Sequence, residues 1–161
     1  MIIAFGKHDG ESVIEVVLKN PEYVNWVLEN TDATGQLRVI RNEMLRFIDI
    51  FNSKPFTQKC WGNSHNCDKP ATRCTTHRED CFALQWWCDE CNPYQNGASP
   101  GTLYVISTYQ NVLGYVSGVC KNRKEDYVSF IKRLAQEKGL PKRLKKGDIE
   151  KFFLPEGVLT F

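Results

Sequence analysis

The chain has 161 residues, of which 42% are apolar and 12% aromatic, and its formal net charge is +2. This composition excludes an intrinsically disordered chain, and the length fits one domain or two small modules. No apolar run reaches the roughly 20 residues of a membrane span, and no basic segment precedes the apolar start as in a signal peptide. We therefore expect no membrane association and a cytoplasmic location.

The first segment, residues 1–54, predicts a small helical module. Met1–Phe5 has the pattern of a short strand, and Gly6 and Gly10 bracket the turn that follows it. The longest helix is expected at Gly35–Phe51, where apolar side chains recur with a period of about 3.6 residues. Two shorter helices are expected before it, at Glu11–Leu18 and from Pro21 onwards.

The middle segment, residues 55–107, contains six of the seven cysteines of the chain. An odd number of cysteines without an export signal argues against a disulfide framework and favours a metal site. Cys88 and Cys91 form a C-x-x-C knuckle, a turn whose two thiolates can reach one tetrahedral ion, and Cys60 and Cys67 supply a second, wider pair. Four thiolates leave no position for a catalytic water, so the pattern predicts a structural Zn²⁺.

Other residues of this segment leave alternatives open. His65 is a substitute for Cys67 as a ligand. Cys74, Cys81 and His77 are close enough in sequence to bind a second ion, but no fourth ligand for it is evident, so the two cysteines are interpreted as buried small apolar residues. The aromatic residues expected to pack around the site and keep water from it are Trp61, Trp86 and Trp87.

The last segment, residues 108–161, follows a strand expected at Leu103–Ser107 and is predicted to be helical. Residues 121–146 contain ten basic and three acidic residues and carry +7, so the rest of the chain carries −5. Such a basic pole can neutralise nucleic-acid phosphates without reading sequence, although a solvated helical face is the alternative interpretation. The candidate contacts are Lys121, Arg123, Lys124, Lys132, Arg133, Lys142, Arg143, Lys145 and Lys146, with Tyr109 and Tyr115 as exposed aromatics that stack on bases.

The N-terminal motif resembles a known module. The run Phe5-Gly6-Lys7-His8-Asp9-Gly10-Glu11, followed by Tyr23-Val24-Asn25-Trp26-Val27-Leu28, is similar to the small C-terminal domain of exodeoxyribonuclease X. The acidic metal-binding motifs of the exonuclease domain are absent from this sequence, so the resemblance implies an accessory nucleic-acid-handling module and does not imply nuclease activity. More loosely, Cys67–Arg73 and Trp86–Tyr94 resemble the knuckles of zinc-ribbon-like proteins.

The glycine-bracketed turn carries a further candidate site. Lys7 and His8 can meet a phosphate there, where the amides of the turn also point. The alternative is that the turn only orients the preceding strand. In the helix that follows, Tyr23, Trp26 and Val27 are expected to share one face.

These patterns predict an α+β protein with a small helical N-terminal module, a zinc-ribbon-like middle and a basic helical C-terminal part. The leading hypothesis is a non-enzymatic, zinc-containing accessory protein that binds nucleic acid, with DNA favoured over RNA. The alternative is a protein-interaction subunit of a larger nucleic-acid-processing or defence complex, in which the three tryptophans of the cysteine segment face a partner. A third hypothesis is a nuclease with an unrecognised site.

Overall fold

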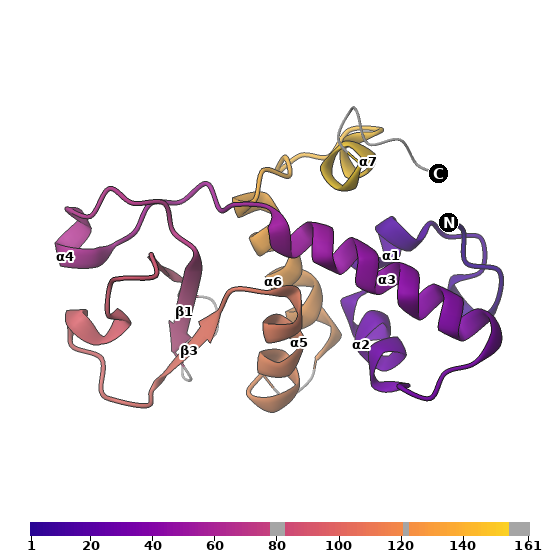
Figure 1. Ribbon diagram of the computed structural model, residues 1–161, viewed down its shortest axis with the longest axis horizontal. Coiled ribbons are helices and arrows are strands. Elements are labelled where there is room, and N and C mark those ends of the chain that lie inside the picture. The colour runs from indigo at the N-terminus through magenta and orange to yellow at the C-terminus, as the bar shows by residue number, and fades with distance from the viewer. Residues whose placement is uncertain (78–82, 121–122, 155–161) are drawn as a thin grey trace.

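The computed structural model describes residues 1–77, 83–120 and 123–154, and its elements form a helical part and a sheet part (Figure 1). The fold is α+β, as expected. The helical part contains η1 (Gly6–His8), α1 (Val13–Lys19), α2 (Pro21–Glu29), α3 (Gly35–Ser53), α5 (Tyr109–Gly118), α6 (Lys124–Glu137) and α7 (Asp148–Phe153). The sheet part contains α4 (Gly62–His65), β1 (Arg73–His77), β2 (Gln85–Trp87), η2 (Pro93–Asn96) and β3 (Leu103–Ile106).

Two sequence candidates, Cys81 and Lys121, lie outside the described residues. The helices predicted at the N-terminus and the strand that precedes α5 are confirmed within two residues at each end. No helix among the described residues combines the length and the apolar character that crossing a membrane requires.

The sheet faces two different cores. It is antiparallel with the order β2-β1-β3, and Cys74 of β1 lies opposite Trp86 of β2 and Ile106 of β3. These three residues belong to the main core, whereas the adjacent Trp87 packs against Cys60 and other cysteines. Because successive strand residues point to opposite faces, the Trp86–Trp87 pair fixes the sheet between the helices and the cysteine segment.

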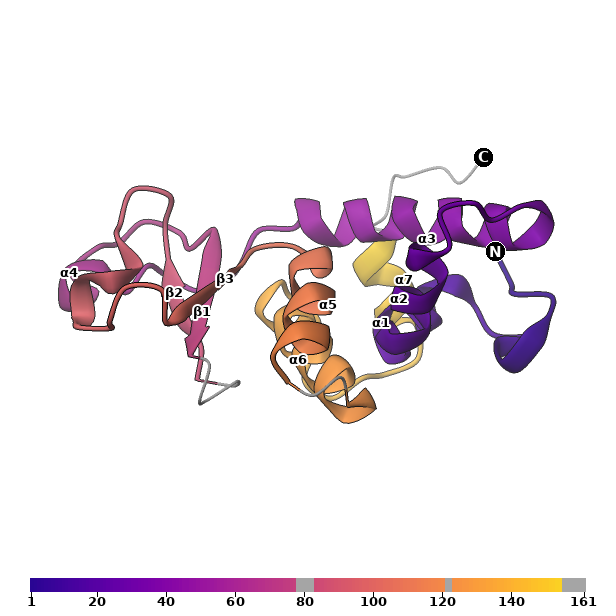
Figure 2. The ribbon, with the colours of Figure 1, turned by 90° about the horizontal axis from the view of Figure 1, so that it is seen from below.

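One hydrophobic core joins the sheet to the helical part, whose helices lie together on one side of the sheet in both views (Figure 1 and Figure 2). The rings of Phe56 and Trp86 are 5.0 Å apart at this junction. Further inside, the Tyr109 hydroxyl donates to the Val17 carbonyl at 2.7 Å. Tyr109 and Tyr115 are buried, so the prediction that they are exposed for stacking on bases is wrong: α5 turns these rings towards the core.

One N-terminal prediction is corrected and a second is refined. Met1–Phe5 is not a strand, because the chain turns at Gly6 with a φ of +76° and only an isolated bridge between Ile2 and Ser12 forms. Tyr23, Trp26 and Val27 lie on one side of α2 as predicted, with the Tyr23 and Trp26 rings stacked, but Trp26 is 50% exposed whereas Val27 is buried. Since a helix advances by about 100° per residue, residue 26 falls outside the stripe that buries residues 24 and 27.

Lys138, one of the ten basic residues of the C-terminal segment, is buried where α6 meets the end of α3. Its ammonium donates to the Lys54 carbonyl at 2.6 Å and lies 4.3 Å from the centre of the Phe56 ring. Burial lowers the pKa of Lys138 from 10.5 to about 8. Lys138 therefore ties the end of α6 to the end of α3 and is not accessible to a nucleic acid.

Because Lys138 is buried, we expect the free energy of unfolding to rise with pH. The unfolded chain keeps the Lys138 proton up to about pH 10.5 but the folded chain only up to about pH 8, so deprotonation favours the folded state between these values. The free energy of unfolding of the wild type should rise by about 2 kcal/mol between about pH 8 and pH 10, relative to Lys138→Met. Urea unfolding of both proteins at the two pH values measures the difference, and a constant difference would contradict this expectation.

Candidate metal centre

The four predicted cysteines converge. The Sγ atoms of Cys60, Cys67, Cys88 and Cys91 all lie within 4.8 Å of one another. Cys60 and Cys67 flank the single-turn helix α4, Cys88 directly follows β2, and Cys91 lies in the next turn. Two separate chain segments thus bring two thiols each to one point, as a tetrahedral thiolate site requires.

Backbone hydrogen bonds hold the two cysteine segments side by side. The Cys60 amide donates to the Lys69 carbonyl at 2.9 Å, which closes the loop between the first two cysteines. The Trp61 amide donates to the Trp86 carbonyl at 2.8 Å and so ties this loop to β2. At the surface, the Lys69 ammonium pairs with the Glu90 carboxylate of the second knuckle. These contacts hold the loop that carries Cys60 and Cys67 beside β2 and the second knuckle.

In the second knuckle the electrostatics favour a thiolate at Cys88, whereas hydrogen bonding to the sulfurs of Cys88 and Cys60 raises the pKa of Cys91 to about 12. Burial by itself would raise the pKa of Cys88, but hydrogen bonds from the backbone amides of Glu90 and Cys91, assisted by neighbouring thiols, outweigh it and lower the pKa to about 7. In the first pair, the Gly62 amide lies 3.3 Å from the Sγ of Cys60 and donates to it. Amides directed at cysteine sulfurs stabilise the charge that a metal-bound thiolate carries.

Trp87 covers the cluster on the side of the sheet. It is fully buried against Cys60 and Cys88, and its indole N–H donates to the Thr75 hydroxyl at 2.8 Å. The prediction that tryptophans shield the site is confirmed for this residue. Trp86 is buried in the main core, so the hypothesis that these two tryptophans face a protein partner is wrong.

The remaining candidate ligands lie elsewhere. His65 is exposed, with its ring 4.8 Å from that of Trp61, and it is not part of the cluster. Cys74 is buried in β1, where burial raises the pKa of its thiol to about 12 and its S–H faces the Ile106 carbonyl at 3.5 Å. The interpretation of Cys74 as a buried small residue is confirmed. No second group of three or more potential metal ligands comes together among the described residues.

Gly62 is a residue of the site that the sequence pattern does not indicate. A Cβ atom at this position would overlap the Sγ of Cys91 and lie 3.3 Å from the Sγ of Cys60. We expect Gly62→Ala to lower the metal affinity by about 10- to 100-fold, as changes next to metal ligands do. Competition with a chromophoric chelator measures the affinity. Gly114→Ala is the matched control, because its Cβ would meet nothing within 4 Å; equal affinities of the two variants would contradict the geometry of the cluster.

The basic residues of α6 are largely paired with acids. The side chains of Arg123 and Asp126 are 3.0 Å apart, those of Arg133 and Glu137 are 3.1 Å apart, and Lys124 lies 3.8 Å from Glu22 of α2. Lys132 is exposed on the same helix. These pairs reduce the positive charge that α6 can present to a phosphate.

A loop between α6 and α7 carries the other basic residues. All residues of 141–146 are exposed, and none of the ion pairs found among the described residues involves this loop. The Lys145 amide donates to the Asp148 side chain at 2.6 Å, which anchors the loop to the start of α7. We define this basic loop by its four cations, Lys142, Arg143, Lys145 and Lys146.

The N-terminal turn separates the two residues predicted there. His8 is buried, with its Nδ1 3.0 Å from the Glu11 carboxylate and its ring 4.4 Å from that of Tyr23. Lys7 is exposed. His8 therefore supports Tyr23 of α2, and Lys7 is the member of this pair that extends into solvent.

The comparisons with known proteins concern this N-terminal region. Residues 3–32 match the exodeoxyribonuclease X-like C-terminal family. The match spans η1, α1 and α2, and so includes Lys7, His8 and the aromatic pair Tyr23 and Trp26. The match therefore covers only part of the N-terminal module, ending before α3, and does not reach the cysteine segment. Neither the curated proteins nor the solved structures gave a match.

Proposed function

We propose that the four cysteines bind one structural Zn²⁺ and that the protein is a non-enzymatic accessory protein that binds nucleic acid. Four buried or half-buried sulfurs around one point suit Zn²⁺, which prefers a closed tetrahedral shell of thiolates in structural sites. The ion would hold together the loops around the three-stranded sheet, because these loops have little regular structure of their own. It would act on the fold rather than in a reaction.

The basic loop is the observation that carries the nucleic-acid proposal. Its four exposed cations are close in sequence and are not neutralised by ion pairs among the described residues. Phosphate contacts of this kind give affinity that depends on salt and not on sequence. DNA is the first nucleic acid to test, because the family matched by residues 3–32 takes its name from a deoxyribonuclease.

Binding to a fluorescently labelled single strand, measured by anisotropy, tests this proposal. Four phosphate contacts predict a slope of about −2.8 for log K against log salt, so affinity should fall about 50-fold between about 50 mM and 200 mM salt. Absence of binding at the lower concentration would refute the proposal. Incubating the complex with Mg²⁺ or Mn²⁺ tests the third hypothesis, a nuclease with an unrecognised site. Cleavage of the strand would identify the protein as a nuclease.

A further inference from the structure

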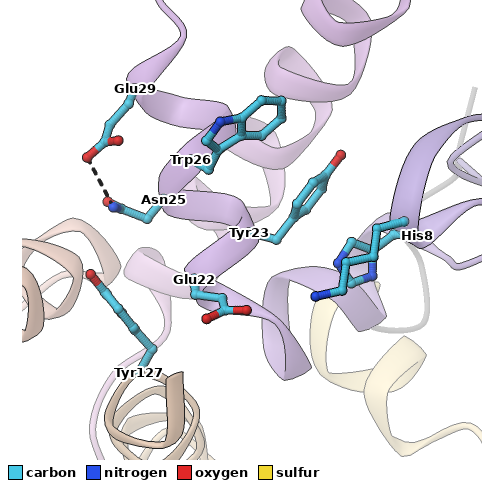
Figure 3. A pocket seen from close by; sticks show the side chains of 8 residues that line it. His8, Glu22, Tyr23, Asn25, Trp26, Glu29 and Tyr127 are labelled. Carbon is cyan, nitrogen blue, oxygen red and sulfur yellow. Dashed lines mark hydrogen bonds between the residues drawn. The ribbon is translucent and has the colours of Figure 1, made fainter. Parts of the chain in front are cut away.

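A second candidate site lies in the N-terminal module, remote in sequence from the basic loop. An open cavity of about 380 Å³ is bounded by η1, α2 and the beginning of α6, a size within the usual range of ligand pockets. Figure 3 shows Tyr23 and Trp26 projecting from α2, with Tyr127 reaching towards that helix from α6. All lining residues except Tyr127 fall within the region matched by the exonuclease-related family.

Aromatic rings form one wall of this cavity. His8 packs against Tyr23, and the Tyr23 and Trp26 rings are stacked, with centroids 5.7 Å apart and an angle of 27° between them. Trp26 is 50% exposed, whereas Trp86 and Trp87 are buried. An indole held by a neighbouring ring, with half its surface in solvent, presents a π-face on which a flat ligand can stack.

Polar groups around the rings suit the edge of a nucleobase. The Asn25 amide donates to the Glu29 carboxylate at 3.1 Å, and the Glu22 carboxylate lies 3.8 Å from the Lys124 ammonium. The carboxylates can accept N–H groups of a base, as acidic side chains do from cytosine. They would repel a phosphate, so we expect the phosphate beside Lys7, which lines the cavity and supplies an ammonium.

We propose that this cavity binds one unpaired nucleobase, stacked on Trp26, with the adjoining phosphate at Lys7. The proposal rests on the proposed nucleic-acid function and adds a preference for single strands or strand ends. A base inside a duplex has both faces stacked and its hydrogen-bonding edge occupied, so it cannot enter. Guanine is the expected best ligand, since its adjacent N1–H and N2–H groups can both donate to one carboxylate.

Trp26→Ala tests the proposal against two labelled strands of equal length, one with normal bases and one made only of abasic sites. The wild type should bind the normal strand more tightly. The variant should bind the normal strand about 5- to 150-fold more weakly than the wild type does, which is the effect of removing one stacking aromatic. It should bind the abasic strand as tightly as the wild type does. Trp26→Phe should recover part of the loss, because it restores a ring at the same position.

The outcomes separate the two proposals. Equal binding of both strands, unaffected by Trp26→Ala, would overturn the base pocket while leaving the phosphate contacts of the basic loop intact. If the wild type binds neither strand, nucleic-acid binding itself is refuted. Quenching of the tryptophan fluorescence by trimethyl-lysine but not by guanosine monophosphate, absent in Trp26→Ala, would also overturn the base pocket, because it would identify the cavity as an aromatic site for cations.

Discussion

Cys88→Ser should abolish metal binding and unfold the sheet part of the protein. A serine hydroxyl is not ionised at neutral pH and cannot replace a thiolate whose pKa is already lowered to about 7 by the amides of its turn. Structural Zn²⁺ contributes about 10–16 kcal/mol of apparent binding free energy in small zinc domains, and that energy is also folding energy. We therefore expect less than a tenth of the wild-type metal content (roughly the limit of nonspecific carry-over).

Amide hydrogen exchange shows where the Cys88→Ser chain opens. The Trp61 and Thr72 amides, which bond to the carbonyls of Trp86 and Trp87, should lose protection. Amides of α3 should keep it, because the helices pack on a core that contains none of the four cysteines of the cluster. Two controls, His65→Ala and Cys120→Ser, should retain the ion, since neither residue belongs to the cluster. Loss of metal from either control would contradict the assignment of the ligands.

Reversing charge in the basic loop should remove most of the nucleic-acid affinity. Lys142→Glu with Lys145→Glu removes two of four phosphate contacts and adds two repulsive charges, so binding near 50 mM salt should weaken about 100-fold or more. The double change to glutamine should reduce the magnitude of the salt slope by about 1.4, because each contact with a single strand contributes about 0.7. Anisotropy titrations at several salt concentrations give both quantities.

A matched pair of substitutions controls for the change in net charge. Lys19→Glu with Arg38→Glu alters the charge by the same amount, and both residues are exposed on other helices, α1 and α3. This control should bind nearly as well as the wild type. If both double variants lose affinity equally, the contacts are spread over the surface and the basic loop is not the site.

The sequence was most informative where local spacing determines geometry. The C-x-x-C spacing predicts a turn that brings Cys88 and Cys91 to one point, and the apolar period of residues 35–51 predicts a helix with one buried face. Two ion pairs of α6 were also predictable, because Arg123 and Asp126, and Arg133 and Glu137, are three and four residues apart. The net charge of residues 121–146, taken alone, does not reveal these two ion pairs.

Features that depend on contacts between distant segments were not predictable. Lys138 is buried because the end of α3 and Phe56 lie beside it, a juxtaposition that no local pattern reveals. Gly62 matters because Cys91 approaches it from another part of the chain. The cavity at Trp26 likewise needs Tyr127 from α6 opposite α2. In each case tertiary packing, rather than propensity or periodicity, decides the role of the residue.

Elemental analysis combined with zinc X-ray absorption of freshly purified, unchelated protein tests the central claim most directly. The account predicts one Zn²⁺ per chain, surrounded by four sulfur atoms at about 2.3 Å, because Cys60, Cys67, Cys88 and Cys91 bring their sulfurs within 4.8 Å of one another. Less than half an ion per chain would contradict it. A shell containing a nitrogen ligand would contradict the four-cysteine assignment and identify a histidine ligand, with His65 as the first candidate.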